Sequence, residues 1–162
     1  MDKQNLRELV AQSGESLINE HERDGGSAPG PCPSSDTTVT PCTDVIMFKS
    51  TDGGVSYSNP VRVNQDNPKS AADQFQPWMA ITPKGQVDIS YFDRRNDPNN
   101  YYIDTYLSRS NDGGKTFFDT RVTHSVWDPE VHPPISPSGQ FIGDYQGIVA
   151  DDSAAIPFWN NT

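Results

Sequence analysis

The sequence is most restrictive in what it lacks. No stretch of its 162 residues approaches the roughly 20 consecutive apolar residues of a membrane-spanning helix, and no apolar signal-peptide segment opens the chain. Basic residues are scarce, since 12 lysines and arginines stand against 22 aspartates and glutamates, for a formal net charge of -10. Nucleic acids and anionic membrane surfaces both require clustered positive charge. We therefore expect neither a nucleic acid nor a membrane as partner.

Cysteine is nearly absent. Cys32 and Cys42 are the only two, neither belongs to a C-x-x-C pair, and no histidine lies near them, so a zinc site is not expected. They form either a disulfide in an oxidising compartment or two free thiols, and their spacing favours neither. Asn96, Asp97 and Asn99 are oxygen ligands of the kind calcium takes, but they lack an EF-hand pattern. We expect no metal and no cofactor.

What the chain does contain is one eight-residue pattern that occurs twice, as residues 50–57 (STDGGVSY) and 110–117 (SNDGGKTF). Glycine supplies the positive φ angles of a tight turn, and the aspartate carboxylate can accept hydrogen bonds from backbone N–H groups within it. A repeat at a fixed offset indicates one supersecondary unit used more than once. We predict a structural role for eight residues of the two copies, namely Ser50, Asp52, Gly54, Tyr57, Ser110, Asp112, Gly114 and Phe117.

Runs rich in β-formers surround both turns. Candidate strands cover residues 45–50, 57–64, 75–82, 86–93, 102–110, 117–123, 144–150 and 154–160. If the strands of one unit are called A, B, C and D, their order along the chain is C-D, then A-B-C-D, then A-B. The predicted fold is all-β, with one complete four-stranded unit between two half units. The mean hydropathy of -0.71 and the 14 prolines fit a loop-rich β protein.

The N-terminal part is different. Residues 2–23 predict a helix, because their apolar residues recur at helical spacing. The chain thus divides into a helical segment (1–26), a Pro/Ser/Thr-rich loop with Cys32 and Cys42 (27–44), and a strand region (45–162). No B strand is visible before residue 45. The helix either covers an open sheet edge, mediates oligomerisation, or belongs to a poorly ordered segment.

The double pattern S-x-D-x-G-x-[ST]-aromatic resembles the Asp-box (bacterial neuraminidase) repeat of sialidase-like β-propellers. Residues 91–98 and 141–147 are also similar to stretches that recur in bacterial Asp-box proteins of the exo-sialidase-like kind. The resemblance covers residues 44–162. It implies a partial β-propeller of four-stranded antiparallel blades, one full blade and two half blades, and an extracellular or cell-surface location. Fold alone does not fix the function.

The resemblance also places candidate site residues. In such propellers the B–C and D–A loops share one rim, here residues 93–101 and 124–143 together with 143–145. Sialidases hold the substrate carboxylate with arginines and use a tyrosine nucleophile with acidic partners. The corresponding substrate-binding candidates are Arg94, Arg95 and Trp127. The catalytic candidates are Tyr145, Glu130, Asp93 and Asp144. The family's Arg-Ile-Pro motif is missing, because residues 155–157 read Ala-Ile-Pro.

Two functions compete. The first is a sialidase-like glycoside hydrolase, or a protein that binds sialic-acid-type or other acidic glycans. The second is a non-catalytic propeller fragment that serves as a binding or assembly module. An open pocket holding Arg94, Arg95 and Tyr145 together favours the first, and pairing or burial of these side chains favours the second. An exposed tryptophan, at Trp78, Trp127 or Trp159, would suit sugar stacking. Unpaired half-unit edges also predict a homo-oligomer by strand sharing, with a trimer favoured.

Overall fold

The computed structural model describes residues 9–13, 43–67, 70, 72–131, 135–136, 139–140, 142–143 and 145–161. These residues form strands, turns and loops with no helix, so the described part of the chain is all-β. The strands are β1 (Leu9–Ser13), β2 (Val45–Lys49), β3 (Val61–Arg62), β4 (Gln74–Ile81), β5 (Val87–Asp93), β6 (Asp104–Ser110), β7 (Phe118–Arg121), β8 (Ile135–Ser136), β9 (Gly139–Gln140), β10 (Gly147–Ala150) and β11 (Ala155–Phe158).

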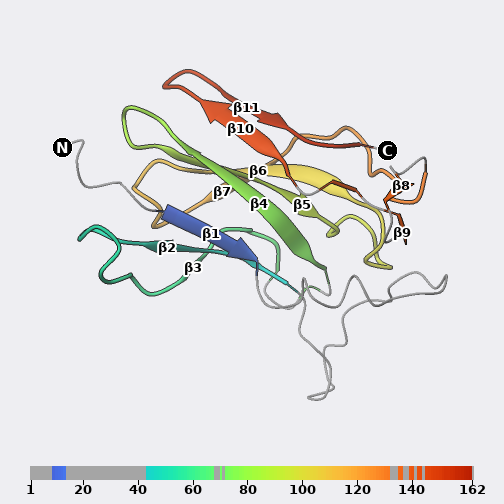
Figure 1. Ribbon diagram of the computed structural model, residues 1–162, viewed down its shortest axis with the longest axis horizontal. Helices are drawn as coiled ribbons and strands as arrows, with labels where there is room; N and C mark the ends of the chain where they lie inside the picture. Colours follow the sequence, from blue (N-terminus) through green and yellow to red (C-terminus); the bar gives the residue numbers. More distant parts are fainter. Residues whose placement is uncertain are drawn as a thin grey trace, which may run out of the picture.

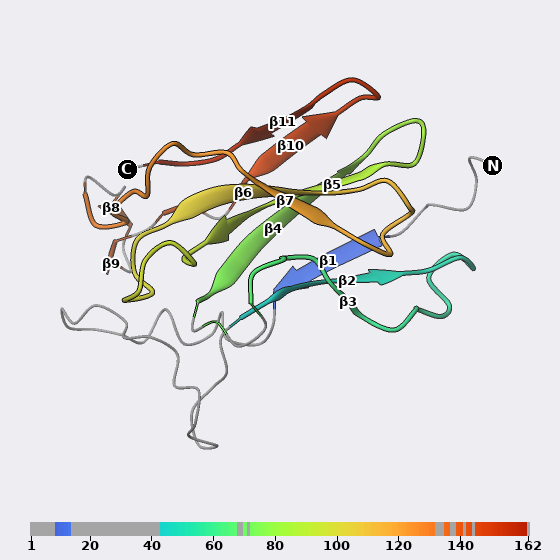
Figure 2. The same ribbon diagram turned by 180° about the vertical axis from the view of Figure 1, so that it is seen from behind.

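Three antiparallel sheets make up most of the described chain. The first sheet has the order β1-β2-β3, the middle sheet β4-β5-β6-β7, and the last sheet β10-β11, with β8 and β9 forming a small separate pair. The middle sheet lies between the other two (Figures 1 and 2). Strand β4, the edge strand of the middle sheet, contacts both β1 and β10. One edge strand from each sheet therefore lies along a common inner side.

The core between the first and middle sheets follows from alternation along the strands. Val45 and Met47 of β2 point toward the middle sheet and are almost fully buried, as are Val87, Ile89 and Tyr91 of β5. Every residue of β5 is buried, because the sheets on either side cover both of its faces. A second cluster of Phe75, Phe92, Ile103 and Trp127 closes the loop end of the middle sheet. This packing fixes where the loops at that end begin.

The four-stranded unit predicted for the middle of the chain is present as β4 to β7 in antiparallel order. The hairpin turns at residues 51–56, 83–86, 111–117 and 151–154 lie at one end of the sheets, and the loops at 94–103 and 122–131 lie at the other (Figure 1). Lys84 N donates to Asp152 Oδ1 at 3.0 Å, which joins two neighbouring turns. The described parts of two candidate site loops, residues 94–101 and 124–131, thus lie at the same end.

The predicted N-terminal helix is wrong where the structure describes it. Residues 9–13 form strand β1, which pairs antiparallel with β2 from Leu9↔Lys49 to Ser13↔Val45. The rest of residues 1–26, and both Cys32 and Cys42, lie outside the described residues. An open edge of β2 offers a row of unpaired N–H and C=O groups, and pairing with it outweighs the helical spacing of this segment. β1 takes the position of the B strand that the sequence did not reveal.

This pairing also corrects one premise of the strand-sharing prediction. The inner edge of β2 was expected to be unpaired and free to accept a strand from another copy. β1 of the same chain occupies that edge. A composite blade of β2, β3 and another copy's β10 and β11 would have to displace β1.

Candidate functional site

The two repeated turns have the same hydrogen-bonded geometry. Asp52 Oδ1 accepts the backbone N–H groups of Val55 and Ser56 at 3.1 and 2.9 Å, and Asp52 Oδ2 accepts the Ser56 hydroxyl. Ser50 Oγ donates to Asp52 Oδ1 and accepts Gly54 N at 2.8 Å. The prediction that this aspartate bonds the N–H groups of its own turn is confirmed.

The second turn repeats each of these bonds. Asp112 Oδ1 accepts Lys115 N and Thr116 N at 2.9 and 3.0 Å, Asp112 Oδ2 accepts the Thr116 hydroxyl, and Ser110 Oγ accepts Gly114 N. The aromatic positions differ between the copies, since Phe117 is 3% exposed in the core whereas Tyr57 is 49% exposed. Only the second turn is anchored to a sheet by its aromatic residue.

These bonds lower the pKa of both carboxyls in the same way. The Ser56 hydroxyl, followed by the Ser56 N–H and the Ser50 hydroxyl, lowers the pKa of Asp52 to about 2 from its usual 3.8. The Thr116 hydroxyl leads the corresponding donors at Asp112, whose pKa is lowered further. Carboxylates that accept several hydrogen bonds stay ionised to unusually low pH. They act as structural anions and not as proton donors near neutrality.

A pH dependence of stability follows from these lowered pKa values. A carboxyl with a lower pKa in the folded state stabilises the fold fully above its unfolded pKa, near 4, and this stabilisation is lost as the pH falls toward about 2. We expect the melting temperature to fall over this window. Asp112→Ala should remove part of that fall and lower the melting temperature at pH 7 by roughly 3–6 °C. Asn111→Ala, at the exposed neighbouring position, is the control, and an equal loss in both variants would contradict the structural role.

Arg95, which was predicted to bind the substrate carboxylate, is already paired with neighbouring carboxylates. Arg95 donates to Asp93 Oδ2 from Nε at 2.8 Å and to Asp119 Oδ2 from Nη1 at 2.7 Å. Its guanidinium also lies 4.1 Å from the centre of the Tyr106 ring and donates to Tyr91 OH at 3.2 Å. The Arg95 side chain is 15% exposed, and that of Asp93 is fully buried. Carboxylates of the chain itself take the place that a sugar carboxylate would need.

The charges of this group are coupled. Burial alone would lower the pKa of Arg95, but the hydrogen bond and negative charge of Asp93 raise it above its usual value. Burial raises the pKa of the Asp93 carboxyl, and the Arg95 guanidinium opposes that rise. Asp93 also accepts the Arg95 backbone N–H at 2.7 Å. Asp93 is thus committed to holding Arg95 and the start of the loop.

Arg94 and Trp127 are also parts of the packed interior. Arg94 is 8% exposed, pairs with Asp73 at 3.6 Å, and lies 4.8 Å from the centre of the Phe75 ring. Trp127 is 6% exposed and packs edge-on against Phe92 at 5.4 Å, while its backbone forms a bridge with Ile103. Neither side chain is open to a ligand on this rim. Trp127 is core, which the sequence left open.

The remaining catalytic candidates are not brought together. Tyr145 is 73% exposed and its ring lies edge-on to Trp78 at 6.3 Å. Glu130 is exposed at the loop end, where its backbone N–H donates to Asp128 Oδ1. Tyr101, and not Tyr145, meets acidic side chains: its hydroxyl donates to Asp128 Oδ1 at 3.0 Å, and burial, Asp128 and Glu130 raise its pKa. Asp144 lies outside the described residues, and no described carboxylate is brought to the Tyr145 hydroxyl.

The oxygen-rich loop considered for calcium is satisfied internally. Asp97 accepts the backbone N–H groups of Asn99, Tyr101 and Tyr102 at 2.8–3.0 Å. These bonds lower the pKa of Asp97 although burial acts to raise it. Asn96 donates to Asp104 and to Tyr106 OH. In the part of the chain that the structure describes, no group of three or more His, Cys, Asp or Glu side chains could hold a metal ion.

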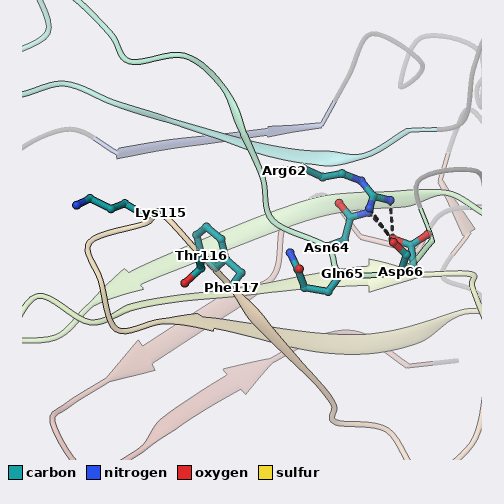
Figure 3. A pocket seen from close by; sticks show the side chains of 7 residues that line it. All are labelled: Arg62, Asn64, Gln65, Asp66, Lys115, Thr116 and Phe117. Atoms are coloured by element: carbon teal, nitrogen blue, oxygen red, sulfur yellow. Dashed lines mark hydrogen bonds and ion pairs between the residues drawn. The ribbon is translucent and has the colours of Figure 1, made fainter.

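One hollow of about 440 Å³ lies where the end of β3 faces the second repeated turn (Figure 3). It is lined by Arg62, Asn64, Gln65, Asp66, Lys115, Thr116 and Phe117. Arg62 is held there by Asp66 and Asp44 at 2.7 and 2.8 Å, and Lys115 extends away from that ion pair. Asn64 is fully buried and donates to Gln74. The ion pair between Arg62 and Asp66 and the hydrogen bond from Asn64 to Gln74 thus engage the polar groups of three lining residues.

The feature that sequence reasoning missed lies on β4. Gln76 has a positive φ of 51°, inside a bulge where the pairing with β5 shifts between Phe75 and Trp78. Its side chain donates to Gly143 O at 2.8 Å. Beyond the bulge, Trp78 remains 42% exposed beside Tyr145. Pro77 was the available signal, because a proline inside a strand pattern marks an edge strand or a bulge.

No model of a known protein family matches the chain, and no curated protein matches it. Among the described residues, no helix is long and apolar enough to cross a membrane.

Proposed function

We propose that the chain is a segment of an Asp-box propeller in which the three sheets are neighbouring blades. Two observations support this proposal. The repeated turns share one bonding scheme, from Ser50 to Ser56 and from Ser110 to Thr116. The sheets also stand side by side with β1, β4 and β10 along one inner side (Figure 1). Radial repetition of short sheets is one way for β structure to limit open edges.

Within that architecture, the chain acts as a non-catalytic binding module and not as a glycoside hydrolase. The observation that carries this choice is the pairing of Arg95 with both Asp93 and Asp119. A clamp for a sugar carboxylate needs an open guanidinium, because recognition is bidentate through the same N–H groups. Retaining hydrolysis also needs a nucleophile and an acid close together. Arg95 is paired and not open, and Tyr101, whose hydroxyl donates to Asp128, has a pKa raised by burial and by Asp128, which opposes its action as a nucleophile.

The ligand that fits the exposed side chains is a glycan bound by stacking. Trp78 of the inner strand β4 and Tyr145, two residues before β10, form an edge-on aromatic pair and are 42% and 73% exposed. A sugar ring presents an apolar face that an aromatic ring can cover, and tryptophan and tyrosine add a polar edge for hydrogen bonds. Arg94 and Arg95 lie in buried ion pairs. The proposed ligand is therefore neutral and not a sugar acid.

Substituting Trp78 tests this site. Trp78→Ala should weaken binding of a neutral oligosaccharide about tenfold, which corresponds to the roughly 1.4 kcal/mol expected of one aromatic stacking partner. Calorimetric titration of a panel of neutral and sialylated oligosaccharides measures the change. Tyr57→Ala is the matched control, because Tyr57 is a half-exposed aromatic that directly follows the first repeated turn, in a different part of the chain.

Three outcomes would count against this function. Equal affinity of the wild type and Trp78→Ala would remove the stacking site. Turnover of a fluorogenic sialoside by the wild-type chain would restore the hydrolase. Salt-sensitive binding of sialic acid that is lost in Arg95→Ala without any loss of stability would restore the acidic-glycan site.

A further inference from the structure

One face of the last sheet is not covered by any described part of the chain. Val149 pairs with Ile156, and Gly147 with Phe158, and residues directly opposite in an antiparallel pair point to the same face. The side chains of Val149, Ile156 and Phe158 are 57%, 52% and 58% exposed. Ile148, on the other face, is 8% exposed. We call Val149, Ile156 and Phe158 the terminal apolar face.

In the middle sheet, the face that corresponds to the terminal apolar face is covered by the last sheet. Ile81↔Val87 and Ala150↔Ala155 are the pairs nearest the two hairpin turns, so Ala80↔Asp88 corresponds to Val149↔Ile156. In the middle sheet that face is turned away from the first sheet, and β10 of the last sheet contacts both β4 and β5. Asp88 is fully buried there. At the corresponding position the last sheet has the more apolar Ile156, half exposed.

The first sheet has an outer face at the opposite end of the stack. Along β2, Val45 and Met47 are buried against the middle sheet, whereas Ile46 and Phe48 point the other way and are half-buried. The first and last sheets lie on opposite sides of the middle sheet (Figures 1 and 2). Arg62 of β3 pairs with Ile46 and so points to the same face, where it is held in ion pairs with Asp44 and Asp66. Among the described residues, the two outer faces thus both present apolar side chains, and they point away from each other.

We propose that the terminal apolar face docks onto the outer face of β2, around Ile46 and Phe48, in a second copy of this chain. The chain already stacks one sheet on the next twice, from the first sheet to the middle and from the middle to the last (Figure 1). One more step of the same kind brings the last sheet of one copy onto the first sheet of another. Because the two faces differ, the contact is heterologous, and it closes into a ring if the rotation allows.

The chemistry of the terminal apolar face agrees with a protein partner. The terminal apolar face carries no charged side chain, and its three large side chains lie on two adjacent strands. Contiguous apolar patches on soluble proteins mark contact sites more often than free surface. The contact is face to face, because β1 already occupies the inner edge of β2. It does not require glycan binding at Trp78, so either proposal can fail alone.

Light scattering on the full chain, without glycan, tests the contact. We expect a mass above the 17.9 kDa of one chain that rises with concentration. Val149→Lys with Phe158→Glu, and separately Phe48→Lys, should each reduce the mass to that of one chain. An equimolar mixture of the two variants keeps one intact pair of faces, so it should stop at a dimer. Phe118→Glu is the matched control, because Phe118 is 67% exposed on β7, the outer edge strand of the middle sheet.

Three results would overturn the proposal. They are a wild-type monomer at every concentration, an oligomer that the Val149/Phe158 variant leaves intact, and a variant mixture that stays monomeric. Circular dichroism confirms that each variant is folded. If Phe48→Lys does not fold, hydrogen exchange of the wild type replaces it. Exchange at residues 45–49 and 147–158 should then slow at high concentration, and unchanged exchange at both would count against the contact.

Discussion

Arg95→Ala should lower the free energy of unfolding by about 3–5 kcal/mol, the range for removing one partner of a buried ion pair. The substitution leaves Asp93, which is fully buried, and Asp119, which is 9% exposed, without their shared cation. It also removes the guanidinium that lies over the Tyr106 ring. Urea unfolding followed by tryptophan fluorescence measures the loss. We expect the largest effect of any single substitution considered for this chain.

The control is Lys115→Ala, which removes an exposed cation and should change stability by less than about 0.5 kcal/mol. Adding Asp93→Asn to Arg95→Ala should recover part of the loss, because it removes one of the two buried charges. An Arg95→Ala protein as stable as the wild type would mean that the arginine is available for a ligand after all.

Gly114→Ala should destabilise the chain by about 2–5 kcal/mol, for two separate reasons. Gly114 has a φ of +83°, and an L residue in the left-handed region costs about 1–2 kcal/mol. A Cβ there would also lie 2.2 Å from Met47 Cε, and Met47 is 1% exposed in the core. Overpacking of this kind typically costs about 1–3 kcal/mol. Equilibrium unfolding of the variant measures the sum.

Gly53→Ala separates the two costs. Gly53 has a similar φ of +76°, but a Cβ there meets nothing within 4 Å. Its destabilisation should therefore reflect backbone strain alone. Replacing Met47 with the smaller valine in the Gly114→Ala protein should recover part of the loss. Equal destabilisation by Gly53→Ala and Gly114→Ala would show that the second turn does not depend on its contact with β2.

The sequence predicted the parts of the fold that local chemistry determines. Asp52 and Asp112 bond their own turns because every donor they need lies within four residues of them along the chain. The β4 to β7 strands form consecutive antiparallel pairs, so alternation and turn residues were enough to place them. Short-range patterns of this kind can be read without knowing the tertiary packing.

Long-range pairing escaped the sequence. β1 was predicted as helix because its partner, β2, lies more than 30 residues away and no local residue indicates that pairing. The role of Arg95 also depends on Asp119, 24 residues further along, which reaches the guanidinium only when β6 and β7 pair. The sequence could predict that an arginine lies on this rim. It could not predict that Asp93 and Asp119 already pair with the guanidinium of Arg95.

The large sequence separation between β1 and β2 has a consequence for the order in which the chain folds. The middle sheet joins only strands that are neighbours in sequence, whereas β1 must close a long loop before it can pair with β2. Loop-closure entropy slows contacts of high sequence separation. The middle sheet can therefore form early and serve as the template, with β1 added last. During synthesis, β1 emerges first, but its pairing partner β2 emerges later. β1 can therefore join the sheet only after β2 has been synthesised.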